Sequence, residues 1–190
     1  MHYIIALMEE EHVNINRMIA VVRNMCCNVL EGGEVPVPDI TDEIDFIRNY
    51  SDKHHHGKEE KILFPVMVAK FGKVAENLIT HGMLVEHELG RGHVLSCESA
   101  LRRYKNEPTT MNKLQVISGI MGWANLLENH TSKENIAVYG FAERMLPEDE
   151  FSKMNKATLE TESAATKAGT QKKYLDLLAR LEEKWCKGEK

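Results

Sequence analysis

Two segments of this chain repeat one another at a constant offset of 75 residues. Glu11-His12 recurs as Glu86-His87, and His55-x-x-Lys58-Glu59 recurs as His130-x-x-Lys133-Glu134. In each copy the second histidine follows the first by 43 residues and precedes its glutamate by four. An internal repeat of this kind indicates one supersecondary unit that the chain uses twice.

Each copy lies in amphipathic helical patterns. Near the start, spacings of three and four residues link Ile5, Met8, His12, Ile15, Ile19, Val22, Cys26 and Val29. This spacing is typical of the buried face of a helix. Similar patterns predict helices over about 39–71, 74–104 and 110–146. We expect the second helix to bury Ile44, Ile47, Ser51, His55, Glu59, Ile62 and Val66, and the fourth to bury Val116, Ile120, Trp123, Leu127, His130, Glu134, Ala137 and Phe141.

Short connections between these helices favour an antiparallel arrangement. The predicted fold is therefore all-α: an up-down four-helix bundle built from two repeated helical hairpins, plus C-terminal helices. We expect residues 1–146 to form the bundle and residues 147–190 to form a helical extension packed on it. The extension carries an apolar stripe of Tyr174, Leu178, Leu181 and Trp185. This stripe is predicted to cover the flank of the bundle, and the alternative is a homodimer surface.

Composition excludes several classes of partner. The formal net charge is −5 without a basic cluster, so we expect no nucleic-acid partner. No apolar run approaches the roughly 18 residues of a membrane span, and the start of the chain has no signal segment, so we expect no membrane association. The four cysteines form no C-x-x-C pair. These features predict a reduced, cytoplasmic protein.

The repeated residues are those of a metal site. Residues four apart lie on one face of a helix, so each hairpin offers two imidazoles and one carboxylate. The two hairpins would bring together His12, His55, Glu59, His87, His130 and Glu134. Without a cation, each unsatisfied buried polar group would cost on the order of 1–3 kcal/mol. Four imidazoles and two bridging carboxylates exceed the needs of one zinc ion and suit a pair of iron or manganese ions with open coordination positions.

The run of three histidines leaves a choice of register. His56 and Glu60 have the same spacing as His55 and Glu59, but 75 residues later they correspond to Thr131 and Asn135. We therefore predict His55 and Glu59 as ligands. We place His54 and His56 at the rim, about 100° to either side, where either could still assist if metal occupancy is irregular. Glu11 and Glu86 also repeat; solvation of the helix or a hydrogen bond to a ligand imidazole would both explain them. His2, His81 and His93 have no repeat partner and are interpreted as surface or ordinary core residues.

Several stretches resemble the hemerythrin-like HHE cation-binding family, over roughly residues 1–146: 45–50 (DFIRNY), 54–65 (HHHGKEEKILFP), 86–91 (EHELGR) and 130–135 (HTSKEN). The resemblance implies a four-helix bundle with a non-haem di-iron centre held by the six residues above. It also implies that the two iron ions are bridged by an oxo or hydroxo group, although zinc or manganese could occupy the same ligands on isolation.

Family activities include oxygen binding, oxygen or iron sensing, nitric-oxide or peroxide chemistry, and repair of damaged iron centres. Oxygen carriers have a fifth histidine one turn from the third-helix ligand, where this chain has Met83 and Arg91. The chain therefore resembles the symmetrical four-histidine, two-glutamate centres of bacterial iron-centre repair proteins more closely than it resembles a carrier. We do not expect the N-terminal cysteine-bearing domain of those repair proteins here.

Three functions follow as hypotheses. The first is a di-iron protein that binds or reacts with dioxygen, nitric oxide or peroxide, or that handles iron. The second is an oxygen, iron or redox sensor without turnover, in which the C-terminal helices respond to the centre. The third is a purely structural metal bundle. No catalytic side chain beyond the metal ligands is predicted, and whether the protein is an enzyme is left open.

Overall fold

A computed structural model describes residues 1–186, which are helical apart from the chain ends and short connections and contain no strand. The first long rod is α1 (Tyr3–Leu30). The second runs through α2 (Val37–Phe46), η1 (Ile47–His56), η2 (Glu59–Leu63) and α3 (Phe64–Phe71), and the third through α4 (Lys73–Leu78), η3 (Ile79–Met83) and α5 (Leu84–Asn106). The fourth comprises α6 (Thr110–Lys133), η4 (Glu134–Tyr139) and α7 (Gly140–Met145). The η segments are π-helical turns.

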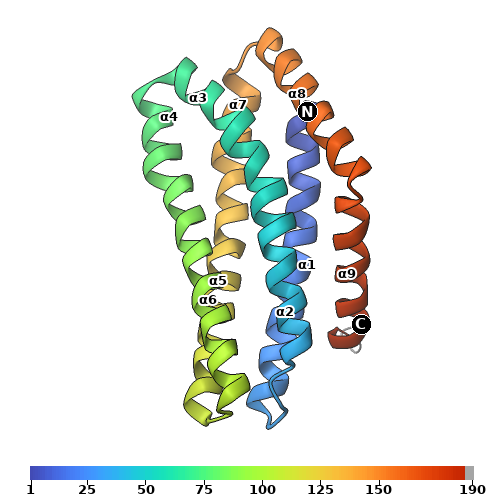
Figure 1. Ribbon diagram of the computed structural model, residues 1–190. Helices are drawn as coiled ribbons and strands as arrows, with labels where there is room; N and C mark the ends of the chain where they lie inside the picture. The colour runs from blue at the N-terminus through green and yellow to red at the C-terminus, as the bar shows by residue number, and fades with distance from the viewer. Residues whose placement is uncertain (187–190) are drawn as a thin grey trace.

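The four rods run alternately up and down, as the sequence predicts (Figure 1). The third and fourth rods approach closely at Gly119, where an added Cβ would lie 2.7 Å from the Cα of Cys97. None of the helices among residues 1–186 is long and apolar enough to cross a membrane.

Two further helices, α8 (Glu148–Lys167) and α9 (Thr170–Trp185), return along one side of the bundle (Figure 1). The predicted stripe on α9 packs on α1 and α2, with Tyr174, Leu178 and Leu181 buried. The indole Nε1 of Trp185 donates a 3.0 Å hydrogen bond to Asp39. The stripe therefore covers the flank of the bundle. A homodimer through these helices, and the boundary at residue 146, stay predictions.

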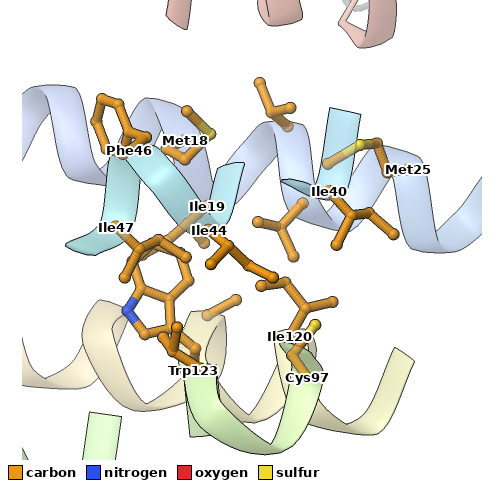
Figure 2. Packing of buried hydrophobic residues seen from close by; sticks show 14 of the residues in the cluster. Met18, Ile19, Met25, Ile40, Ile44, Phe46, Ile47, Cys97, Ile120 and Trp123 are labelled. Atoms are coloured by element: carbon orange, nitrogen blue, oxygen red, sulfur yellow. The ribbon is translucent and has the colours of Figure 1, made fainter. Parts of the chain in front are cut away.

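The apolar core consists of two clusters, one toward each end of the bundle. The larger cluster joins α1, α2, α5, α6 and α9, and Figure 2 shows Trp123, Ile47 and Ile44 meeting inside it. The smaller cluster joins the start of α1 to α3, α4, α7 and α8. Buried charged and polar side chains, among them the predicted ligands, lie on each rod between the residues of the two clusters. The candidate site is thus walled by apolar packing at both ends.

The buried faces of the second and fourth rods shift by one residue beyond the ligand glutamates. Ile62 and Val66 are only half-buried, whereas Leu63 and Met67 are fully buried. Ala137 is exposed and Phe141 half-buried in the fourth rod, and Val138 and Ala142 take their places in the core. These predicted core positions were wrong because η2 and η4 are π turns, which hold more residues per turn than an α-helix. The shift recurs at the 75-residue offset, so it belongs to the repeat.

A carboxyl group is buried in the larger cluster without a partner. Glu43 is 0% exposed, and neither of its side-chain oxygens has a hydrogen bond. Burial raises the pKa of Glu43 well above its usual range, and the nearby charge of Asp39 adds to the effect. Between the ordinary carboxyl pKa and this raised value, the folded chain therefore binds more protons than the unfolded chain.

We predict that Glu43→Met stabilises the protein at pH 7 by about 1–3 kcal/mol, the usual cost of a buried unpaired polar group. Native stability should fall as pH rises above about 4.5, because ionising Glu43 opposes folding, and this fall should be smaller in the variant. Urea unfolding at pH 4.5 and pH 7 measures both effects, with exposed Glu31→Met as the control. An unchanged pH dependence in the Glu43 variant would contradict the prediction.

Candidate metal centre

All six predicted ligands come together inside the bundle. His12 comes from α1, His55 from η1, His87 from α5 and His130 from α6, while Glu59 and Glu134 open the π turns η2 and η4. None of these side chains is more than 1% exposed. They fall into two adjacent groups: one contains His12, His55, Glu59 and Glu134, and the other contains His87, His130 and a further histidine, His56.

The two carboxylates connect the groups. Glu134 lies 3.3 Å from Nε2 of His12, 3.2 Å from Nε2 of His130 and 3.6 Å from Nε2 of His87. Glu59 lies 3.5 Å from Nε2 of His87 and 3.8 Å from Nε2 of His55. Each carboxylate therefore faces imidazoles of both groups, as a carboxylate that bridges two metal ions would.

Several of the inward-facing atoms have no hydrogen-bond partner. They are Nε2 of His56, His87 and His130, Oε2 of Glu59 and both carboxylate oxygens of Glu134. Buried polar atoms in folded proteins are almost always satisfied, so a cluster of unsatisfied ones needs an explanation. The donor set of imidazole nitrogens and carboxylate oxygens fits a pair of transition-metal ions, which would satisfy these atoms together.

Each inward-facing histidine also makes a hydrogen bond through its second ring nitrogen, Nδ1. Nδ1 lies 2.7 Å from Asn135 in His12, 2.9 Å from Glu11 in His55, 3.2 Å from Asp52 in His56, 2.7 Å from Glu60 in His87 and 2.9 Å from Glu86 in His130. A carboxylate or amide oxygen accepts the hydrogen bond here, so Nδ1 is the donor and Nε2 is the ring nitrogen left for a metal ion. This is the arrangement found around metal-binding histidines.

The repeat extends to these supporting residues. Glu11 and Glu86 hold His55 and His130, and they are themselves bound by Lys58 and Lys133. Of the two roles left open for these glutamates, the structure supports the hydrogen bond to a ligand imidazole. The residue that directly follows each predicted ligand glutamate binds a histidine of the other hairpin. Asn135, after Glu134, accepts a hydrogen bond from His12, and Glu60, after Glu59, accepts one from His87. The site is thus pseudosymmetric in both its inner residues and its supports.

It is energetically unfavourable for the buried carboxylates of Glu59 and Glu134 to be ionised at the same time. Burial raises the pKa of Glu59 to about 8, and the charge of Glu134 adds to the rise. Burial opposes ionisation of Glu134 as well, but His130, His12 and His87 lower its pKa well below the usual value. One carboxylate therefore holds a proton in the absence of other cations, and a metal ion would replace that proton.

The prediction that His54 and His56 lie at the rim was wrong. Their residues are 7% and 4% exposed, and both are buried. The prediction assumed α-helical angles, whereas η1 is π-helical, and its wider turn lets neighbouring side chains face the interior together. Their environments differ. The ring of His56 is stacked on that of His87 and lies edge-on to that of His130. Nε2 of His54 instead lies 3.0 Å from Glu11 and 3.1 Å from Nζ of Lys58.

Sequence reasoning missed several residues around the centre. Tyr139 donates a 2.5 Å hydrogen bond to Glu59, and its counterpart in the other hairpin is Phe64. Asp52, which supports His56, stands four residues before it, and this spacing was an available signal. Glu162 of α8 contacts Lys58 at 2.6 Å, but nothing in the sequence links so distant a residue to the site.

A cavity of about 250 Å³ adjoins the second group. Its wall includes the rings of His56 and His87 together with apolar side chains of η1, α5 and α6, such as Ile47, Val94 and Trp123. Arg48 and Arg91 also line it, each paired with acidic side chains. The cavity therefore gives space for a small molecule directly behind two of the histidines.

Comparison with known proteins identifies one family. The family model described as the hemerythrin HHE cation-binding domain matches residues 3–142, which is most of the chain. No curated protein and no solved structure matched the chain.

We predict that Glu86→Ala weakens metal binding by about 10- to 100-fold, the usual effect of removing a residue that supports a ligand. Loss of Glu86 removes the acceptor that orients His130, and Lys133 is half-exposed, so it stays hydrated. Titration of the metal-free protein with ferrous iron under anaerobic conditions measures the affinity. The control is Glu76→Ala, at an exposed position in α4. Equal affinities in the two variants would contradict the assigned role.

Proposed function

The chain belongs to the hemerythrin HHE cation-binding family, and on that premise we propose that it is a non-haem di-iron protein. In this proposal His12, His55, Glu59, His87, His130 and Glu134 are metal ligands, and the centre binds or reacts with dioxygen, nitric oxide or peroxide, or handles iron. A bound iron pair would supply one-electron redox chemistry and coordination positions open to such a ligand.

The observation that carries the proposal is the meeting of two imidazole nitrogens in the core. Nε2 of His12 and Nε2 of His55 lie 2.8 Å apart, and each ring has its Nδ1 bonded to a side-chain oxygen. Two lone pairs at this distance repel unless a cation lies between them. A proton can take that role, but the unsatisfied atoms of His87, His130 and Glu134 in the same interior favour metal ions.

The surrounding residues have roles that follow from their contacts. Tyr139 holds Glu59 through its hydroxyl group, which also lies 3.4 Å from Nε2 of His12. A hydroxyl at that point can donate a proton or a hydrogen bond to a small ligand at the centre. The apolar clusters at both ends exclude bulk water, which strengthens the electrostatic interactions inside. The surrounding side chains thus orient the proposed metal ligands and shield them from bulk water.

Metal analysis combined with visible spectroscopy tests the proposal. We predict about two iron ions per chain, because the two groups of donors suit two ions. Protein that was reduced anaerobically should gain, on exposure to air, absorption bands of an oxo-bridged ferric pair, which zinc cannot produce. Stopped-flow mixing with dioxygen, nitric oxide and peroxide then identifies the reactive ligand.

A chain that takes up zinc alone, or an iron form whose spectrum changes with none of the three ligands, would contradict the proposal. His130→Ala separates it from a purely structural role, because only a reactive centre should lose its ligand-dependent spectral change. The matched control is His81→Ala, at an exposed position that has no repeat partner.

A specific contact favours sensing as a second candidate function. Lys58 is fully buried, and its ammonium group binds both Glu11 and Glu162. Glu11 holds His55, so hydrogen bonds connect a proposed ligand to the C-terminal helix α8. A change at the centre that moves His55 would alter this ion pair, and with it the packing of α8. The extension could then report the state of the metal to a partner.

Limited proteolysis tests this alternative. If the centre controls α8, residues 148–186 should be cut at different rates in the metal-free, ferrous and ferric forms. Glu162→Gln should reduce the difference, because it removes the charge that meets Lys58. Glu160→Gln, at an exposed position of the same helix, is the control. Equal cleavage rates in all metal states would exclude sensing through α8.

A further inference from the structure

We propose that the cavity beside His56 and His87 is a binding site for a small uncharged organic molecule that is mostly apolar and carries one hydroxyl group. The cavity measures about 250 Å³ and lies between η1, α5 and α6. An apolar cavity of about 150 Å³ is large enough to hold benzene. A six-membered ring with one substituent therefore fits this space. The inference goes beyond the proposed function, because binding of such a molecule needs no metal ion.

The cavity coincides with a difference between the two copies of the repeat. Gly90 lines it, and the residue 75 positions earlier is Ile15, whose side chain is completely buried. A Cβ added at Gly90 would lie 3.4 Å from Leu127 and 4.0 Å from Trp123, which are also wall residues. A larger side chain at position 90 would therefore occupy the cavity. The first hairpin fills the equivalent position with a side chain, and the second leaves it open.

One hydroxyl group of the wall lacks a hydrogen bond. Ser51 of η1 is 0% exposed, and its Oγ has no partner. A serine inside a helix can bond to a backbone carbonyl one turn earlier, but Ser51 does not. The repeat does not require a polar residue here, since Leu126 stands 75 positions later. Buried hydroxyl groups are almost always paired, so this one indicates a partner that comes from outside the chain.

The charged side chains of the wall favour a neutral occupant. Arg48 donates two hydrogen bonds to Glu98, at 3.0 Å and 2.9 Å, and Arg91 binds both Asp52 and Glu60. An anion would compete with these carboxylates for the guanidinium groups, and a cation would be repelled by them. The wall is otherwise apolar except for the serine and the two histidines. One hydrogen bond and an apolar surface are therefore what the cavity offers.

The cavity is accessible from solvent. Its wall includes Leu95 of α5, which is 57% exposed, and the half-exposed side chain of Arg48. The C-terminal helices α8 and α9 lie along a different side of the bundle from α5 (Figure 1). A small molecule can therefore enter without displacing the extension.

Isothermal titration calorimetry with phenol and benzene tests the inference in the protein as purified. The two probes share one ring, and only phenol has the hydroxyl group. Ser51→Ala removes the hydroxyl of the wall, and Ser96→Ala, at an exposed position of α5, is the matched control. We expect the native chain to bind phenol about 3- to 10-fold more tightly than benzene, the effect of one neutral hydrogen bond. This preference should disappear in Ser51→Ala and persist in Ser96→Ala.

A second pair of variants tests the location. Gly90→Ile places the side chain of the other hairpin in the cavity and should weaken binding of both probes at least tenfold. Gly92→Ile is the control, because Gly92 is exposed and a Cβ added there meets no atom within 4 Å. Circular dichroism reports whether each variant is folded. If Gly90→Ile does not fold, Gly90→Ala adds a single methyl group and should weaken both probes by a smaller factor.

Three results would overturn the inference. The first is a native chain that binds neither probe. The second is binding of both probes that the variants at Gly90 leave unchanged, which would place the probes elsewhere, including at the metal centre. The third is an equal preference for phenol in the native chain and in Ser51→Ala. Failure of the di-iron proposal is a separate result, because the iron content of the protein does not enter these comparisons.

Discussion

The structure depends on the burial of charge at the middle of the bundle. Glu59 and Glu134 are completely enclosed, and burial favours their neutral forms. Four of the surrounding imidazoles are aligned by outer carboxylates and that of His12 by the amide of Asn135. The outer carboxylates are in turn bound by Lys58, Lys133 and Arg91. Charges therefore alternate outward from the centre. Few arrangements of four helices satisfy all of these contacts at once. The buried polar residues therefore specify how the helices align as well as what they bind.

Much of this arrangement could be predicted from the sequence. The repeat and the three-and-four spacing predict the bundle, and the fold class is confirmed. They also predict which six side chains would converge. A hydrogen bond between Glu11 and a ligand imidazole was one of the two predicted roles, and only the structure identifies that imidazole as His55. Ligation itself stays a prediction.

The remainder depended on local geometry that residue spacing does not encode. No residue type in the sequence marks a π turn. Such turns nevertheless bury Leu63 in place of Ile62 and turn the side chain of His56 into the interior. The assumption of 100° per residue fails at such turns, which are common at functional sites. Contacts from distant segments, such as Glu162 with Lys58, arise from how α8 lies on the bundle, and no periodic pattern in one sequence contains that information.

The coverage of the bundle by α8 on one side makes the two halves of the repeat unequal environments. Lys58 is fully enclosed beneath the helix, whereas its counterpart Lys133 is half-exposed. The first ion pair therefore operates in a medium of low polarisability, and mobile ions screen it little, while the second lies within reach of the ionic atmosphere. Salt concentration thus acts on one half of a duplicated structure more than on the other. Identical residues at equivalent positions need not respond alike to the solution around the protein.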